Sequence, residues 1–333
     1  MKKELGLLGL LILLCLMVCG VELGKQLHAG ATVSQLELPR FLSQTNLTNT
    51  ANLIGLFGIF SIGLGMVIIT GGIDLSVGSM CALVGALLAM ALGEWHWPWP
   101  VAALCAVLIP MLLGWAHGWL ITRMNMQPFI VTLCGLLIYR GVARTVTGDA
   151  TKGFTSAQGI DTLRSLTSGK FLGVPMPFVM LIVIGVIMWI VLHRSVYGRY
   201  LLAVGRNEEA ARFSGINTRL IIAGAYVLAG LLTGISAIMF AFYTNSISPS
   251  NHGTFYELYG IAAAVLGGCS LRGGEGSILG IVIGTTLLLV LQNLVNLLEI
   301  PSSLNFAVMG SVVLAGVLAD QILQKRRSKG ASR

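Results

Sequence analysis

Long apolar runs separated by short polar loops dominate the whole chain. A helix that crosses a membrane needs ~20 mostly apolar residues. Ten segments reach or approach that length, and they are 6–23, 52–70, 77–93, 100–121, 128–147, 174–193, 219–242, 257–270, 277–298 and 303–322. The runs are continuous and lack the alternation of barrel strands, so they predict helices. Segment 257–270 is short, and we expect it to be either a short span or a half-helix that re-enters.

Composition agrees with the hydropathy pattern. Of the 333 residues, 55% are hydrophobic and only 10% are charged, and the mean hydropathy is +0.85. Ordinary soluble domains carry ~25% charged residues, so the composition excludes a typical soluble enzyme and also a disordered chain. We therefore predict an all-α polytopic membrane protein with about ten transmembrane helices, some of them short or broken. It forms a single transmembrane domain over 1–333, because no loop is long enough to bury a separate core.

The first apolar segment has two interpretations. Lys2 and Lys3 precede it, so it resembles a signal peptide, and Leu16 to Cys19 resemble a lipoprotein cleavage site. Val18 is bulky where a cleavage site prefers a small residue, which favours a retained membrane anchor. Both interpretations place residue 25 outside and leave the remaining topology unchanged.

The basic residues set the expected orientation. With the N-terminus inside and ten spans, the C-terminus also lies inside, and most Lys and Arg residues then fall in inside loops. We attribute the net charge of +8 to this excess of basic residues in inside loops, and we expect no nucleic-acid binding. Both termini are expected to be cytoplasmic. The longest inside loop is 194–218, and two longer outside loops are 24–51 and 148–173.

The sequence lacks the motifs of nucleotide hydrolysis, metal binding and catalysis. The sequence has no G-x-x-x-x-G-K-[ST] phosphate loop and no H-E-x-x-H motif. The six cysteines lie in apolar stretches without Cys-x-x-Cys spacing, so they read as small buried hydrophobes. We expect no bound metal, no cofactor on this chain and no catalytic residues. His117, inside the fourth span, is expected to be a packed histidine.

The segment from Gly71 to Ser79 reads Gly-Gly-Ile-Asp-Leu-Ser-Val-Gly-Ser and separates two spans. Its glycines permit a break, and Ser76 and Ser79 are expected to cap the next helix. Asp74 lies at or just inside the membrane boundary, where a carboxylate needs a partner or a wet cavity. Two interpretations stay open, in which Asp74 lines the permeation route or stabilises a helix N-terminus.

The inside loop contains a second informative segment. Residues 208–213 are expected to form a short amphipathic helix that Gly215 ends. Glu208, Glu209 and Arg212 give it a charged face, and Ala210, Ala211 and Phe213 offer small and aromatic contacts. Such a surface suits docking into a groove on a soluble partner, although composition alone favours an ordinary solvated loop.

Aromatic and amide side chains form a third group near the expected outer mouth. Tyr243 and Asn245 precede Glu257, which begins a short span. Aromatic rings and amides suit a sugar through stacking and hydroxyl hydrogen bonds. Glu257 is also a natural charge at a helix N-terminus, so both roles stay open.

Several of these segments resemble one family. Glu209-Ala210-Ala211, followed after three residues by Gly215, resembles the E-A-A-x-x-x-G coupling loop of ABC-importer permeases. The Gly71–Ser79 block resembles that of the sugar permeases, which include the ribose, xylose and arabinose permeases. Segments 127–133, 197–199 and 263–274 are also similar to that family, and the blocks occur in the family order over about residues 50 to 320. Arg206-Asn207 stands where the family often has Gly-Asn.

The resemblance implies a transport role and a set of partners. Such permeases form homodimers or heterodimers in the inner membrane. A separate cytoplasmic ATPase with nucleotide-binding modules carries ATP and Mg, and a periplasmic sugar-binding protein delivers the substrate. The coupling loop, here Glu208, Glu209, Ala210, Ala211 and Gly215, would dock on the ATPase. The pathway or gate candidates are Asp74, Ser76, Ser79, Tyr243, Asn245 and Glu257.

A proton-coupled secondary transporter of a small polar solute is the alternative. It needs a titratable carboxylate near mid-membrane, whereas the candidates here fall near span ends. A membrane-embedded enzyme lacks a recognisable site, and a structural scaffold would not need broken spans. The sequence leaves the sugar open, from pentoses and hexoses to deoxysugars and autoinducer-like compounds.

Overall fold

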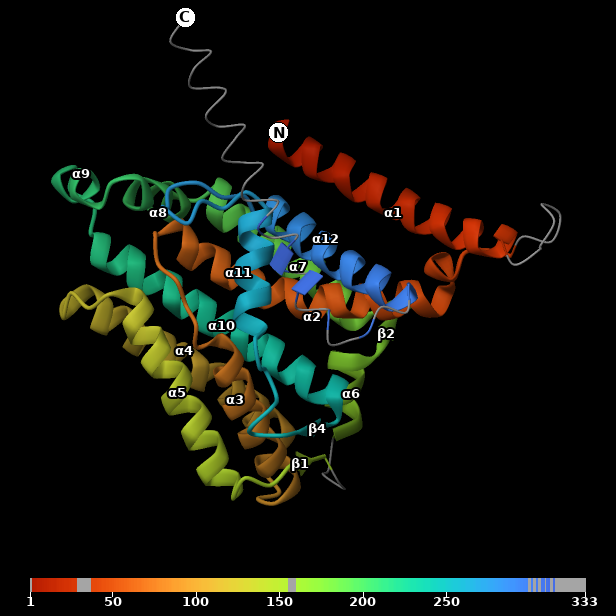
Figure 1. The fold of residues 1–333 in the computed structure, drawn as a ribbon. Coiled ribbons are helices and arrows are strands. Elements are labelled where there is room, and N and C mark those ends of the chain that lie inside the picture. The colour runs from red at the N-terminus through yellow and green to blue at the C-terminus, as the bar shows by residue number, and fades with distance from the viewer. Residues whose placement is uncertain are drawn as a thin grey trace, which may run out of the picture.

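The structure is a computed structural model that describes residues 2–28, 37–154 and 160–298, with single positions between 301 and 314. Helices make up most of this part of the chain (Figure 1). They are α1 (Lys2–His28), η2 (Arg40–Leu42), α2 (Gln44–Ile69), α3 (Val77–Gly93), α4 (Trp99–Arg123), α5 (Pro128–Thr147), α6 (Ile160–Ser168), α7 (Met176–His193), α8 (Val196–Arg206), α9 (Glu208–Phe213), α10 (Thr218–Thr244), α11 (Tyr256–Leu266) and α12 (Ile278–Leu297).

Two pairs of very short strands join the loops at one end of the molecule. Strand β1 (Lys152–Gly153) pairs antiparallel with β4 (Ser246–Ile247), and Lys152 lies opposite Ile247. Strand β2 (Lys170–Phe171) pairs antiparallel with β3 (Val174–Pro175), and Lys170 lies opposite Pro175. The first pair ties the loop after α5 to the end of α10.

Nine of the ten predicted spans are apolar helices in the structure. Seven described helices are long and apolar enough to cross a membrane, namely α1, α2, α4, α5, α7, α10 and α12. Val77–Gly93 and Tyr256–Leu266 are shorter apolar helices, as the sequence predicted for the second of them. The tenth predicted span, 303–322, and the basic tail lie outside the continuously described residues, so the count of ten stays a prediction.

Helix α3 has the bounds predicted for it, but alone it is too short to cross the membrane. Its 17 residues extend ~26 Å at the usual helical rise, against a hydrocarbon core of ~30 Å. The irregular segment Gly72–Ser76 precedes it, so the chain at this place is helical only from Val77. The expectation of a helix interruption between residues 71 and 79 agrees with the structure.

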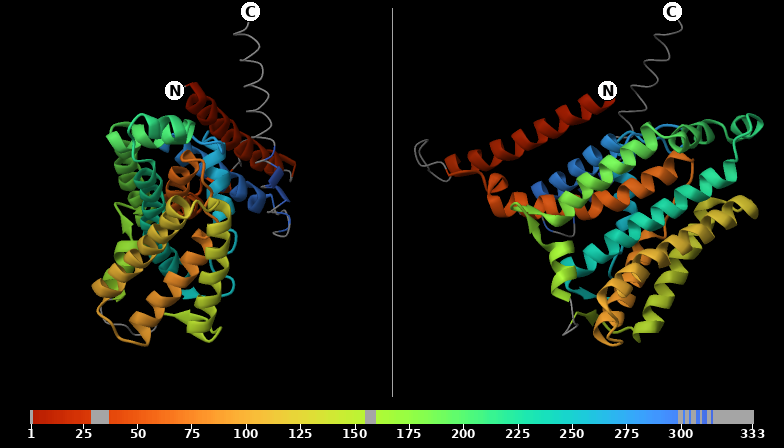
Figure 2. Two further views of the ribbon diagram at one scale, coloured as in Figure 1. Left: turned by 90° about the vertical axis from the view of Figure 1, so that its left-hand side faces the viewer. Right: turned by 180° about the vertical axis from the view of Figure 1, so that it is seen from behind.

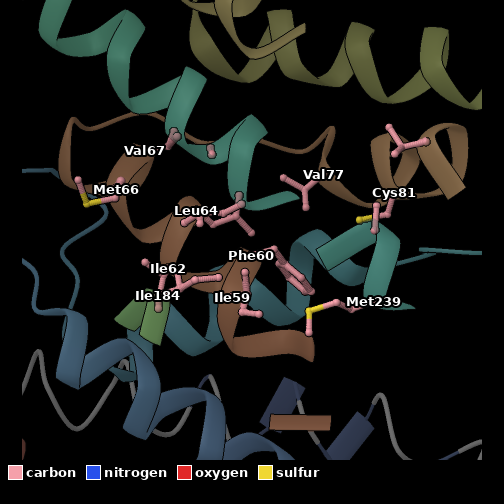
Figure 3. Close-up of a cluster of buried hydrophobic side chains, with 14 of the residues drawn as sticks. Ile59, Phe60, Ile62, Leu64, Met66, Val67, Val77, Cys81, Ile184 and Met239 are labelled. Carbon is pink, nitrogen blue, oxygen red and sulfur yellow. The ribbon is translucent and has the colours of Figure 1, made fainter. Parts of the chain in front are cut away.

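Helix α2 forms the centre of the bundle. It contacts α7, α10, α11 and α12, and its residues from Ile54 to Ile69 are almost all buried. Figure 3 shows α2 side chains such as Ile59 and Leu64 among Val77 of α3, Ile184 of α7 and Met239 of α10. A helix that is apolar on every side is expected to be surrounded by other helices, and α2 follows that rule.

Helices α4 and α10 pack through glycines supplied by both. A Cβ atom on Gly114 of α4 would lie 2.2 Å from the Tyr226 carbonyl oxygen, and one on Gly230 of α10 would lie 2.2 Å from the Pro110 carbonyl oxygen. Gly118 faces Ala223 in the same way. These small residues therefore serve helix packing, because lipid offers no hydrophobic driving force and close contact supplies the attraction.

The helices and strands lie at two ends and on two sides of the bundle. Helices α8 and α9 lie at one end, and α6 with strands β1 and β4 lies at the other (Figure 1). Helices α4 and α5 lie on the side far from α1 (Figure 2). Helix α1 packs on α12, and the Phe41 N–H donates to the Glu22 carboxylate at 2.9 Å.

The α4–α10 contact can be tested with two matched glycine-to-alanine substitutions. We expect Gly230→Ala to lower the melting temperature in detergent, because the new Cβ would overlap the Pro110 carbonyl and overpacking costs about 1–3 kcal/mol. Gly185→Ala is the control, since no atom lies within 4 Å of its Cβ position in α7. Both variants gain the same helix propensity, so an equal effect of the two would contradict the packing argument.

Candidate functional site

The double glycine ends α2 with a defined hydrogen-bonded turn. Gly71 adopts a φ of +85°, its N–H donates to the Ile68 carbonyl at 2.9 Å, and the Gly72 N–H donates to the Val67 carbonyl at 3.2 Å. This pair of bonds is the Schellman arrangement, which needs a left-handed residue after the helix. The segment Thr70–Ser76, called here the α2–α3 break, therefore starts with its backbone groups satisfied.

Asp74 is buried at the other end of the break and holds its local turn. The Asp74 Oδ1 atom accepts hydrogen bonds from the Ser76 N–H at 2.8 Å and from the Ser76 hydroxyl at 2.6 Å. The expectation that the serine side chains cap α3 is wrong: the Ser76 hydroxyl accepts no helix N–H, and the Ser79 hydroxyl donates to the Ser76 carbonyl at 2.8 Å. The carboxylate competes better for these donors than a neutral oxygen would.

Glu257 joins the beginning of α11 to the beginning of α3. Its carboxylate lies against the first turn of α3, where a Cβ on Gly78 would overlap the Glu257 Oε2 atom. The two helix starts touch through glycines, since a Cβ on Gly78 would lie 2.1 Å from the Gly253 carbonyl oxygen. Gly253 itself has a φ of +71°. Glu257 therefore lies at a helix N-terminus, as predicted, and its carboxylate also adjoins the start of α3.

Four of the predicted pathway candidates thus come together. Asp74, Ser76, Ser79 and Glu257 are all at most 7% exposed and surround the start of α3. Both carboxylates lie at helix ends, as predicted, but these ends are inside the bundle and not at its surface. A buried carboxylate needs hydrogen bonds that compensate for lost water, and for Asp74 the N–H and the hydroxyl of Ser76 provide them.

A second group of buried polar side chains borders the break. The Tyr139 hydroxyl and the His117 Nε2 atom are 2.7 Å apart, and the rings stack at 5.6 Å. The Tyr226 ring meets the His117 ring edge-on at 6.4 Å, and a Cβ on Gly72 would lie 2.6 Å from the Tyr226 hydroxyl. His117 is packed, as predicted, but within a polar cluster whose other members the sequence did not single out.

Two further side chains fix the backbone around these groups. The Thr132 hydroxyl of α5 donates to the Ile73 carbonyl at 3.0 Å, so α5 supplies a partner for the break. Arg140 of α5 donates to the carbonyls of Pro249 at 3.0 Å and His252 at 2.6 Å. Sequence reasoning left Arg140 without a role, although a lone arginine inside an apolar span is itself a signal.

Tyr243 and Asn245 lie at the end of α10. Asn245 ends α10 with a φ of +56°, and its side-chain oxygen accepts a hydrogen bond from Arg164 at 2.8 Å. It lines an open groove of about 520 Å³ together with residues of α6, the lining being Asp161, Arg164, Ser165, Ser168, Gly169, Phe242 and Asn245. The neighbouring Tyr243 side chain is exposed. A role of these two residues in the pathway stays a prediction.

The predicted helix in the inside loop is present as α9. The Asn207 side chain accepts a hydrogen bond from the Ala210 N–H at 2.9 Å, which caps the helix, and Gly215 follows its end with a φ of +85°. Glu208, Glu209 and Ala210 are exposed, whereas Ala211 is buried against the rest of the chain. Phe213 is 84% exposed, with the Arg212 guanidinium 5.8 Å from its ring centre.

The residues that the structure describes contain no cluster of three or more His, Cys, Asp or Glu side chains suited to a metal ion. Around the break, the Asp74 carboxylate accepts from Ser76, the Thr132 hydroxyl donates to the Ile73 carbonyl, and the His117 and Tyr139 side chains pair with each other. The arrangement is therefore built to hold an interrupted span in place.

The role of Asp74 as a hydrogen-bond acceptor predicts a ranked effect on stability. We expect Asp74→Ala to lower the free energy of unfolding by about 1–3 kcal/mol, since two buried donors of Ser76 lose their acceptor. Asp74→Asn keeps an acceptor oxygen and should retain most of the stability. Detergent melting curves measure this, with Asp161→Ala at the exposed start of α6 as the control. Equal losses for Asn and Ala would mean that the charge, not the acceptor, matters.

Comparison with known proteins identifies the family. The family model described as "Branched-chain amino acid transport system / permease component" matches residues 46–317. The ribose import permease protein RbsC of Bacillus subtilis (strain 168) is 38% identical over 284 residues, which cover 85% of this chain and 87% of the relative. The xylose transport system permease protein XylH of Escherichia coli (strain K12) is 29% identical over 343 residues, covering 86% of this chain and 87% of the relative. No solved structure matches the chain. The chain therefore belongs to the family of branched-chain amino acid transport system permease components.

Proposed function

We propose that the chain is the membrane permease subunit of an ATP-driven importer for a monosaccharide or a related small polyol or sugar derivative. Its similarity to ribose and xylose permeases over most of both chains is the observation that carries this proposal. The chain forms the translocation pathway and carries out no reaction of its own. ATP and Mg bind to a separate cytoplasmic ATPase, and a periplasmic sugar-binding protein delivers the substrate.

Helix α9 is the docking surface for the ATPase in this proposal. Glu208, Glu209 and Ala210 face outward, and Phe213 exposes an aromatic ring next to a guanidinium group. Exposed aromatic and charged side chains on a short, capped helix are typical of interface anchors. Ala211 fastens the helix to the bundle, and Gly215 turns the chain away from it. The α9 end of the bundle is then cytoplasmic, with both termini on that side, in the bacterial inner membrane.

The pathway candidates divide into two sets with different roles. Asp74, Ser76, Ser79 and Glu257 hold the start of α3 inside the bundle, where a shift of the α2–α3 break changes the shape of the interior. Tyr243 and Asn245 lie at the opposite end of α10 from the α9 end and meet substrate at the outer mouth. A second permease subunit, identical or related, completes the pathway between the two chains.

Reconstitution separates this function from proton-coupled transport. Vesicles that hold the chain together with its ATPase and binding protein should accumulate radiolabelled ribose or xylose only when ATP is supplied. Vesicles that hold the chain alone should accumulate neither sugar under an imposed pH gradient. Uptake driven by the pH gradient alone would overturn the proposal.

Reversing the charge on α9 should uncouple the transporter. We expect Glu209→Lys to insert and melt as the wild type does, because its side chain is exposed and stabilises no buried group. It should bind the ATPase at least tenfold more weakly and lose ATP-driven uptake in proportion. Affinity capture of the ATPase and uptake into vesicles are the two measurements.

Glu37→Lys is the matched control for this charge reversal. Glu37 is also exposed, but its backbone pairs with Gln26 near the end of α1, far from α9 (Figure 2). It should leave ATPase binding unchanged. If Glu209→Lys retains both ATPase capture and uptake, the assignment of α9 as the docking surface is wrong.

A further inference from the structure

Four glycines lie where three segments of the chain meet beneath α9. Gly205 is in the last turn of α8, Gly71 is in the α2–α3 break, and Gly273 and Gly274 are in the loop between α11 and α12. We call this set the glycine junction. The Gly274 N–H donates to the Ile69 carbonyl at 2.8 Å, so the loop is bonded directly to the last residue of α2.

The segments touch through their backbones. A Cβ atom on Gly205 would lie 1.9 Å from the Ile69 carbonyl oxygen and 2.4 Å from the Gly274 nitrogen. A Cβ on Gly273 would lie 2.7 Å from the Gly205 carbonyl oxygen and 2.9 Å from the Gly71 nitrogen. Such separations leave no room for any side chain. A contact between backbones has no rotamers that could absorb a displacement, so movement of one segment moves the others.

Two of the three segments are stiffened by their own hydrogen bonds. The Ser270 N–H donates to the Glu275 carbonyl at 3.1 Å, and the Gly273 N–H donates to the Ser270 carbonyl at 2.9 Å, which closes the α11–α12 loop into a tight turn. The end of α2 is held by the two Schellman bonds described above. Gly71, Gly273 and Gly274 all have φ near +80°, at +85°, +84° and +75°, a region that side chains disfavour.

The third segment connects the junction to α9. Asn207 alone separates α8 from α9, its N–H donates to the Ala203 carbonyl at 3.1 Å, and its side chain caps α9. Ala211 is buried and completes the attachment. A push on α9 therefore moves the end of α8, where Gly205 lies only three residues before α9 begins.

We propose that the glycine junction transmits displacement of α9 to the α2–α3 break and to the α11–α12 loop, with Gly205 and Gly274 as positioning residues for coupling. The inference rests on the proposed function, in which an ATPase moves α9. Gly71 lies three residues before Asp74, and the α11–α12 loop follows the helix that carries Glu257. The junction thus links the docking surface to both buried carboxylates that hold α3.

The test compares two glycine-to-alanine substitutions with similarly close clashes. Gly205→Ala places a Cβ inside the junction, whereas Gly230→Ala places one 2.2 Å from the Pro110 carbonyl oxygen, at the contact of α10 with α4, which contains no segment of the junction. Each is purified with the ATPase and binding protein and reconstituted in vesicles. The measured quantity is ribose or xylose taken up per ATP hydrolysed, corrected for the amount of folded complex.

The two variants should differ in uptake per ATP and not merely in the yield of folded complex. We expect Gly205→Ala to hydrolyse ATP while its uptake per ATP falls at least tenfold. Gly230→Ala should lose folded complex but keep the wild-type ratio. A wild-type ratio for folded Gly205→Ala, or the same loss of ratio in both variants, overturns the inference. Failure of the wild-type complex to transport either sugar would instead refute the proposed function.

A milder variant decides the question if Gly205→Ala does not fold. A Cβ on Gly274 would lie 2.4 Å from the Arg206 Cγ atom, at the root of a flexible side chain, and 2.8 Å from the Arg206 nitrogen. Gly274→Ala should therefore fold in part and show a reduced uptake per ATP. Arg206→Ala in the same chain removes the Cγ contact and should raise the ratio again. An unchanged ratio in Gly274→Ala overturns the inference.

Discussion

An interrupted helix inside a membrane bundle must satisfy every backbone N–H and C=O that the interruption frees. In hydrocarbon no water replaces a lost partner, and each unpaired group costs several kcal/mol. In the α2–α3 break, partners are present for several of these groups. The Schellman turn pairs the N–H groups of Gly71 and Gly72, Thr132 donates to the Ile73 carbonyl, and Asp74 accepts from the Ser76 N–H. The Glu257 carboxylate lies beside the first turn of α3.

The same constraint explains why the polar residues of the break are buried but not free. A carboxylate that accepts two donors is a better partner for freed N–H groups than a neutral side chain. Glycines then let neighbouring segments approach closely, as Gly78 and Gly253 do at the start of α3. The same set of contacts therefore satisfies the break and fixes its position.

Hydropathy alone predicted most of the helices, because the length of an apolar run is a direct consequence of membrane thickness. Segments 77–93 and 128–147 match α3 and α5 residue for residue, and α9 coincides with the predicted 208–213. The partners of the break were not predictable in this way, since Thr132, Tyr139 and Tyr226 reach it from helices distant in sequence. The contact of Asn245 with α6 was not predictable for a related reason. Asn245 adopts a left-handed conformation at the end of α10 and its side chain bonds to Arg164 of α6, a local choice that no periodicity signals.

Helix α9 shows how a very short element is held in a fixed position. Six residues cannot form a stable helix in isolation, because the cost of nucleation exceeds the gain from one turn. Two contacts supply the missing stability, since Asn207 caps the first turn and Ala211 is buried in the core of the bundle. The preceding helix α8 is itself held at its end, where the absence of a side chain at Gly205 brings its backbone against that of α2. In the proposed coupling, the fixed position of α9 and the close packing at Gly205 depend on each other, since a flexible junction would absorb a displacement of α9 before it reached α2.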